Sequence, residues 1–228
     1  MDWNLAIKRN REALSRILAA LFALVGLPEG RPASGPLTLP RHLHAHALRI
    51  LRAAESAIRR LVVIAAREID VQPRPAGGFS MQEFGGKRQA DAAVRIPAFP
   101  LLDPLRKFSF DPPRRASRFM PRICVVGFTE PAPLPVIPVL SPDDPVAGAG
   151  LCRRLLSSRR ALANLPREAR RLARWQARNR LRSGPGRVAP LRFGAPPGRR
   201  KRPIHLVDDI LKECHSLALD VLSPPDTS

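Results

Sequence analysis

The chain has 228 residues, of which 26 are proline and 39 are Lys or Arg, and its formal net charge is +20 at pH 7. Proline at more than twice its usual share, with nine Phe, two Trp and no Tyr, argues against one compact core over the full length. Three Cys exclude a disulfide framework, and no apolar run approaches the roughly 18 residues of a membrane-spanning helix.

Residues 3–27 are predicted to form an amphipathic helix. Asp2 or Asn4 suits the N-cap, and Gly26 and Pro28 are expected to end the helix. The helical spacing places six apolar side chains on one face: Trp3, Ile7, Leu14, Leu18, Leu21 and Val25.

Two roles are open for this first helix. A cleaved secretory signal is disfavoured, because Asp2 and Glu12 interrupt the cationic region and no A-x-A site follows. The helix is expected either to pack against a partner helix or to lie in an anionic membrane surface. In the second case the inserted side chains are Trp3, Leu18, Leu21, Phe22 and Val25.

Residues 41–68 repeat the apolar periodicity after a proline-limited loop over 28–40. Residues 1–70 are therefore predicted to form an αα-hairpin. Arg49, Arg52, Arg59 and Arg60 fall mainly off the apolar face. Because two helices bury little area, the hairpin needs a third helix, a second copy of itself or a membrane surface.

Residues 71–150 are predicted to be a proline-rich, disordered linker, because composition there favours an extended chain without a core. The run Ile123–Phe128 has strand character but no obvious pairing partner. The phrases RIPAFPLLDP and GFTEPAPLP are more apolar than an ordinary linker, which leaves open that they dock on another surface.

Residues 151–182 are predicted to form a basic amphipathic helix. Pro166 either kinks it or opens a new helix with Asn164 as N-cap. A basic Gly/Pro/Arg linker follows over 183–203, and residues 204–228 contain a C-terminal amphipathic helix and tail. The apolar stripe of that last helix is Val207, Ile210, Leu211, Cys214, Leu217, Ala218 and Val221.

The charge is concentrated in one part of the chain. Residues 151–203 hold 17 basic side chains against the single acid Glu168, a net charge of +16. One helical face about 22 Å long carries Arg167, Arg171, Arg174, Arg178 and Arg182, and Arg170 and Arg180 widen it. Such a face favours a nucleic-acid backbone as partner, with Trp175 able to stack on an unpaired base. The predicted nucleic-acid-binding residues are Arg167, Arg170, Arg171, Arg174, Trp175, Arg178, Arg182, Arg199, Arg200, Lys201 and Arg202.

Other reactive side chains give no support for catalysis. On the predicted helix only His42 and His46 align, and no carboxylate completes a metal site with them. Cys214 and His215 are adjacent on a helix and point about 100° apart, so they are poorly placed as nucleophile and base. We expect no enzyme activity, no cofactor and no metal.

Several phrases together resemble a known family. They are DWNLAIKRNREAL, RIPAFPLLDP, GFTEPAPLP, SPDDP, LCRRLLSSRRALANLPREARRLARWQAR and RPIHLVDDILKECHSLALDVLSPPDTS. The chain resembles an uncharacterised family of Arg/Pro-rich bacterial proteins with no assigned function. The resemblance implies a bacterial protein and carries over no activity or site residue.

The sequence thus predicts a mainly α protein with an N-terminal helical hairpin, a long proline-rich middle, a basic helix and a short C-terminal helix. The expected function is low-specificity binding of the nucleic-acid phosphate backbone by residues 151–203. The alternatives are a peripheral membrane protein and a structural adaptor that binds proteins, or itself, through its apolar stripes. The expected location is cytoplasmic, with membrane association as the alternative.

Overall fold

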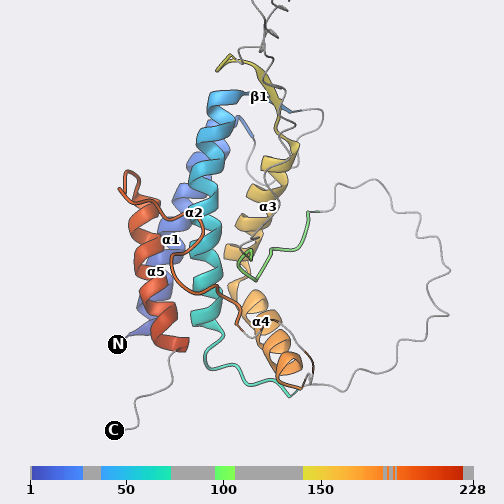
Figure 1. Ribbon diagram of the computed structural model, residues 1–228, viewed down its shortest axis with the longest axis vertical. Helices are drawn as coiled ribbons and strands as arrows, with labels where there is room; N and C mark the ends of the chain where they lie inside the picture. The colour runs from blue at the N-terminus through green and yellow to red at the C-terminus, as the bar shows by residue number, and fades with distance from the viewer. Residues whose placement is uncertain are drawn as a thin grey trace, which may run out of the picture. The chain divides into compact units, whose positions relative to one another are not determined.

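Five helices and two short strands make up the part of the chain that the computed structural model describes, namely residues 2–27, 37–72, 96–105, 141–181, 184, 187 and 189–222. In chain order they are α1 (Trp3–Leu24), β1 (Thr38–Pro40), α2 (Arg41–Ala65), β2 (Pro145–Ala147), α3 (Ala149–Ala163), α4 (Leu165–Arg180) and α5 (Leu206–Leu222) (Figure 1). The prediction of a mainly α protein is confirmed.

α1 begins and ends where the sequence indicates. The Asp2 carboxylate accepts hydrogen bonds from the backbone N–H groups of Asn4 and Leu5, both at 3.0 Å, and so satisfies two donors at the helix start. Gly26, at φ 68°, follows the C-cap residue Val25 in the left-handed conformation that glycine adopts without cost.

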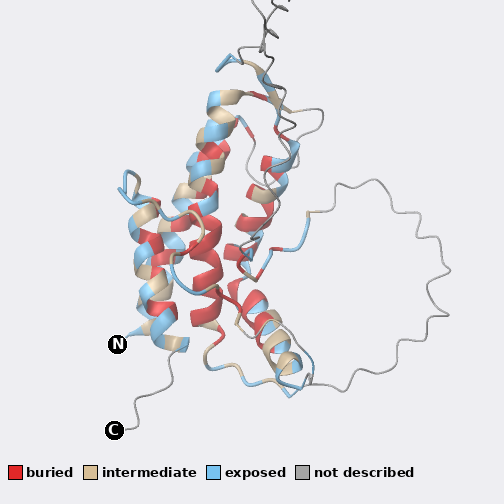
Figure 2. Cartoon of the chain, in the orientation of Figure 1, coloured by how far each residue is buried: buried red, intermediate tan, exposed pale blue. Residues whose placement is uncertain are grey.

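α2 is the central helix of the fold. It contacts α1, α3, α4 and α5, so its second half is buried on every side (Figure 2). All residues from Ala53 to Ile64 are buried. Ala53, Ala54 and Ala57 lie in this stretch, and small side chains let neighbouring helices approach closely. The predicted pairing of the first two helices is confirmed, and α5 and α3 supply the additional helices that such a pair needs.

The structure describes only part of the predicted linker over 71–150. Residues 73–95 and 106–140, which include Ile123–Phe128, lie outside the described residues. Within 96–104, however, Phe99 and Leu101 are buried in the core, so this segment is docked rather than disordered. β2 pairs antiparallel with β1, with Leu39 opposite Val146. Segment 96–104 is docked because the apolar residues of RIPAFPLLDP bury surface against the helices.

The predicted basic helix is two helices. α3 ends at Ala163 and α4 begins at Leu165, with Asn164 between them and Pro166 in the first turn of α4. The Asn164 carbonyl accepts hydrogen bonds from the N–H groups of Arg167 and Glu168. The side chain of Asn164 makes no cap bond to α4. Proline therefore opens a helix here rather than kinking one.

α5 confirms the predicted C-terminal stripe. Val207, Ile210, Leu211, Cys214, Leu217 and Ala218 are all buried, mainly against α2. Asp208 and Asp209 lie in the first turn, where the helix dipole favours a negative charge. The Asp208 carboxylate also accepts from the backbone N–H groups of Ile204 and His205.

Candidate nucleic-acid interface

Four of the predicted arginines lie on one exposed face of α4, which we call the α4 stripe: Arg167, Arg170, Arg174 and Arg178. The opposite face of α4 carries Leu165, Ala169 and Leu172, which are buried in the core. Because helical residues three and four apart share a face, burying those apolar side chains turns the four arginines outward together.

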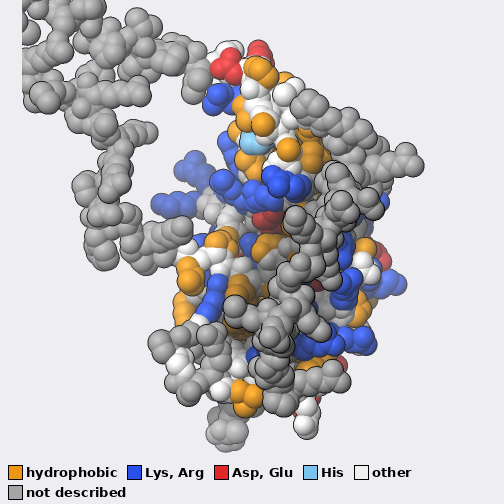
Figure 3. All heavy atoms as spheres, turned by 90° about the vertical axis from the view of Figure 1, so that its right-hand side faces the viewer, with side chains coloured by type: hydrophobic (Ala, Val, Ile, Leu, Met, Phe, Trp, Pro, Cys, Tyr) orange, Lys and Arg blue, Asp and Glu red, His pale blue; other side chains and the backbone are white. Residues whose placement is uncertain are grey.

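The α4 stripe has no acidic partner within the described part of the chain. Arg178 Nε donates a hydrogen bond to the backbone carbonyl of Arg174, at 3.3 Å. Arg167, Arg170 and Arg174 line an open hollow of about 480 Å³ together with Ala163, Asn164 and Pro166. Figure 3 shows the side of the molecule on which α3 and α4 lie, where blue Lys and Arg side chains far outnumber red Asp and Glu.

Two predicted site residues of α4 have structural partners instead. Arg171 forms an ion pair with Glu168 and donates a hydrogen bond to the carbonyl of Phe99. Trp175 is half-buried and packs against the core cluster. This geometry does not favour the expectations that Arg171 binds a phosphate and that Trp175 stacks on a base, because both side chains already have partners within the protein.

The remaining predicted residues do not join the α4 stripe. Arg182 lies outside the described residues. The tract Arg199–Arg202 precedes α5, on the side of α2 away from α4 (Figure 1). Gly198 holds the tract there, because its φ is 84° and an added Cβ would come within 2.8 Å of the backbone N of Ala53 in α2. Arg199, Lys201 and Arg202 are exposed, whereas Arg200 is half-buried.

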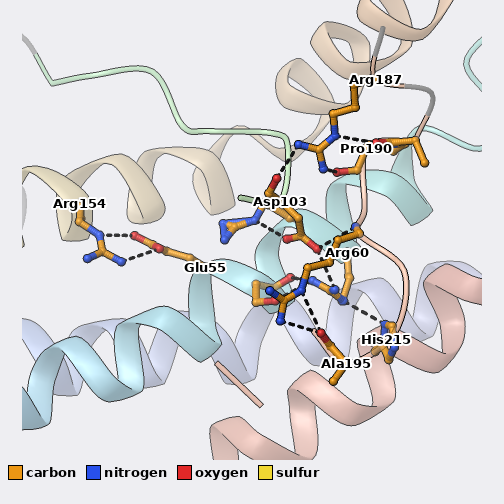
Figure 4. A network of polar contacts seen from close by, with 12 residues as sticks. Glu55, Arg60, Asp103, Arg154, Arg187, Pro190, Ala195 and His215 are labelled. Carbon is orange, nitrogen blue, oxygen red and sulfur yellow. Dashed lines mark hydrogen bonds and ion pairs between the residues drawn. The ribbon is translucent and has the colours of Figure 1, made fainter. Parts of the chain in front are cut away.

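A buried charge network, which the sequence did not reveal, holds two non-helical segments to α2 (Figure 4). Asp103 is fully buried, and its carboxylate accepts from Arg59 Nε at 2.9 Å and from Arg60 Nη2 at 3.0 Å. Arg187 donates to the backbone carbonyls of Asp103 and Pro190. Asp103 thereby fastens the segments 96–104 and 189–192 to the second half of α2.

Arg59 and Arg60, which the sequence places mainly off the apolar face of the second helix, are nevertheless buried, because that side of α2 is covered as well. They are 4% and 0% exposed. Burial lowers the pKa of each guanidinium, and the negative charge of Asp103 offsets part of that effect. Arg60 also donates to the carbonyl and the hydroxyl of Ser56, at 2.8 and 2.6 Å. Glu55 of α2 makes a two-bond ion pair with Arg154 of α3, with both distances 2.8 Å.

The Cys214 and His215 pair has no nucleophile–base geometry. Cys214 is fully buried, and burial raises the pKa of its thiol to about 12, so the thiol stays protonated at neutral pH. His215 accepts a hydrogen bond at Nδ1 from Arg60 Nε, at 3.2 Å. Burial and the nearby positive charge of Arg60 lower the pKa of His215, which keeps its imidazole neutral. The pair therefore serves packing and hydrogen bonding.

His42 and His46, the two aligned members of the alternating histidines, have different contacts. His42 Nδ1 lies 3.1 Å from the carbonyl oxygen of Pro142, while the ring of His46 meets the ring of His205 edge to face at 5.5 Å. Among the described residues, no three His, Cys, Asp or Glu side chains gather as metal ligands would.

The side chains that were expected to insert into a membrane are not exposed on α1. Leu18, Leu21, Phe22 and Val25 are at most 5% exposed because they pack in the core, and Trp3 is half-buried against it. Insertion would require α1 to leave that core. In the described part of the chain, no helix is both long enough and apolar enough to cross a bilayer.

Comparison with known proteins adds no relative: neither protein-family models, nor curated proteins, nor solved structures gave a match. The resemblance to Arg/Pro-rich bacterial proteins stays a prediction. Function is therefore inferred from the chemistry of the surface alone.

Proposed function

We propose that the protein binds nucleic acid with low sequence specificity, through phosphate contacts of the α4 stripe. The observation that supports this is four exposed guanidinium groups on one helical face, without an acidic side chain paired to any of them among the described residues. A basic hollow at one end of the stripe adds a concave surface for an anion.

The spacing of the stripe suits a chain of negative charges. Arg167 and Arg178 are 11 positions apart, which at about 1.5 Å per residue corresponds to roughly 16 Å along the helix. Like charges at such spacings destabilise a helix unless something neutralises them. A guanidinium binds phosphate oxygens through two parallel N–H donors, so a phosphodiester backbone neutralises the stripe more effectively than isolated ions do.

Low specificity follows from the kind of contact. Phosphate contacts position a protein on nucleic acid but carry no sequence information. Base readout needs side chains that reach base edges or aromatic rings that stack on them. Trp175, the aromatic residue nearest the stripe in sequence, is half-buried in the core packing, which favours backbone contacts over base contacts.

The test is a fluorescence-anisotropy titration of the full chain with labelled oligonucleotides at several salt concentrations. Four phosphate contacts give a slope of log K against log salt of about −3 to −4. This corresponds to a roughly 50- to 150-fold loss of affinity between 50 and 200 mM salt. The variant with Arg167, Arg170, Arg174 and Arg178 replaced by Gln should lose most of that slope for every sequence tested.

A matched control separates the stripe from net charge. Arg49, Arg52, Lys201 and Arg202 are exposed and lie away from α4, so replacing these four by Gln removes the same charge. The control should keep most of the affinity and the slope. Equal losses in the two variants would mean that only net charge matters.

Two other results would contradict the proposal. One is an affinity that does not respond to salt. The other is flotation with vesicles containing phosphatidylserine that depends on the four stripe arginines, in the absence of oligonucleotide binding, which would assign the stripe to a membrane surface.

A further inference from the structure

The hollow beside the α4 stripe continues into two further grooves. It shares Ala163 with a groove between α1 and α3 that is lined also by Arg11, Ser15 and Arg159. That groove shares Arg11 and Ser15 with an open groove along α1. Through these shared residues the three hollows are adjacent to one another, from α4 past the α3–α4 joint to α1, and we call this series of hollows the track.

Basic side chains line the track along its whole course. On α1 they are Lys8, Arg11 and Arg16, all exposed. Glu12, in the groove along α1, is the one acidic side chain among the described residues that line the three grooves. None of Lys8, Arg11 and Arg16 is paired with an acid among the described residues.

Arg11 joins the two halves of the track. Its Nη2 donates to the carbonyl of Ala163 at 3.1 Å, at the C-terminal end of α3. The last carbonyls of a helix carry partial negative charge, which would repel a phosphate passing this point. The guanidinium of Arg11 covers one such carbonyl, and so keeps the joint favourable to an anion.

Resting on the proposed function, we infer that the ligand is single-stranded nucleic acid, whose backbone continues from the α4 stripe over the α3–α4 joint onto Lys8, Arg11 and Arg16 of α1. α4 is inclined to α3 (Figure 1), so the track changes direction at the joint. Duplex DNA is stiff over about 150 base pairs and resists bending within a few nanometres. A single strand follows such a turn at little cost.

The test uses a variant that spares the joint. Lys8→Gln with Arg16→Gln removes two α1 cations and leaves the bond from Arg11 to Ala163 in place. The control is Arg9→Gln with Arg49→Gln, because Arg9 pairs with Glu213 of α5 and neither residue lines the track. Both variants lose two charges. Thermal unfolding of each variant checks that the fold persists.

For a labelled 20-nucleotide single strand, the Lys8/Arg16 variant should flatten the salt slope by about 1.4. The affinity lost should then be roughly sevenfold larger at 50 mM than at 200 mM salt. The control should stay close to the parent chain, and a 20-base-pair duplex should bind both variants within about twofold of the parent.

Each contrary outcome has a distinct meaning. If the Lys8/Arg16 variant keeps the parent's salt slope on the single strand while the α4 variant is still defective, the ligand contacts α4 but not α1. That result would overturn this inference and leave the proposed function standing. Equal losses on strand and duplex would overturn the single-strand assignment, and an equal loss in the control would reduce the effect to net charge. If the variant with all four stripe arginines replaced binds with the parent's affinity and salt slope, the proposed function itself is contradicted.

Discussion

The arginines of α2 and those of α4 show two ways in which this fold deals with the same side chain. Arg59 and Arg60 lie in the middle of the core, and each forms an ion pair with the fully buried Asp103. The four arginines of the α4 stripe lie on the surface and have no such acid in the described structure. Arginine content alone therefore says little about ligand binding, since a partnered guanidinium is part of the architecture and an unpartnered one is available to a ligand.

The largest effect that tests this comparison is expected at Asp103. Asp103→Ala would leave two buried guanidinium groups without their counter-charge, and should lower the free energy of unfolding by about 3–5 kcal/mol. Urea unfolding followed by circular dichroism measures the change. Asp209→Ala, at an exposed acid of α5, should cost well under half as much. A loss at Asp103 no larger than at Asp209 would mean that the network contributes little.

Gly198→Ala is expected to have the next largest effect. The positive φ and the approach of the added Cβ to within 2.8 Å of α2 backbone should destabilise the fold by about 1–3 kcal/mol. Gly150→Ala is the matched control, because Gly150 lies within α3 with no atom near an added Cβ, so this change should be neutral or slightly stabilising. Thermal unfolding compares the two variants.

His215 should make stability depend on pH. Its pKa in the folded protein lies below the ordinary value of 6.5, so the unfolded chain binds a proton at higher pH than the folded chain does. The contribution of His215 is complete above pH 6.5 and is lost as the pH falls from there towards the lowered pKa.

His215→Asn keeps an acceptor for Arg60 and removes this titration, so its free energy of unfolding should fall less steeply on the acid side. Urea unfolding measured from pH 7.5 to pH 5, in steps of about half a pH unit, gives the slope of the free energy of unfolding against pH. A His44→Asn variant controls for the loss of a histidine elsewhere. An acid slope that is the same in all three chains would assign the pH dependence to other groups.

The smallest effect is expected where function is proposed. Replacing the four stripe arginines by Gln should leave the free energy of unfolding unchanged or raise it by up to about 1 kcal/mol at low salt, because each relieved like-charge pair contributes a few tenths. The gain should vanish near 1 M salt, where charges are screened within about 3 Å. A clear destabilisation would show that these arginines support the fold, as those of α2 do.

Periodicity was sufficient to predict the helices but not their partners. The stripes of α1 and α5 and the break at Pro166 are local features, readable over a few turns. The burial of Arg59 and Arg60 depends on tertiary contacts. Because the second half of α2 is enclosed on all sides, its polar residues do not mark a solvent-exposed face. Their partner Asp103 lies more than 40 residues away in a segment without helical or strand periodicity.

The same reasoning divides the predicted binding residues. Helical spacing alone predicts the shared face of Arg167, Arg174 and Arg178, with Arg170 beside it, and the same spacing also places Arg171 there. Arg171 differs because its acceptor, the carbonyl of Phe99, belongs to a distant docked segment. The position of the tract Arg199–Arg202 depends on the close packing of Gly198 against the α2 backbone. No pattern in the basic residues predicts that contact.

The two ends of the segment between Pro104 and Pro142 are both fixed to α2. Asp103 is fastened to Arg59 and Arg60, and the carbonyls of Pro142 and Asp144 accept from the backbone N–H groups of His42 and Arg41. Because both anchors lie on one helix, a substitution at Asp103 is expected to release one end of this connection while the backbone bonds to His42 and Arg41 still hold the other.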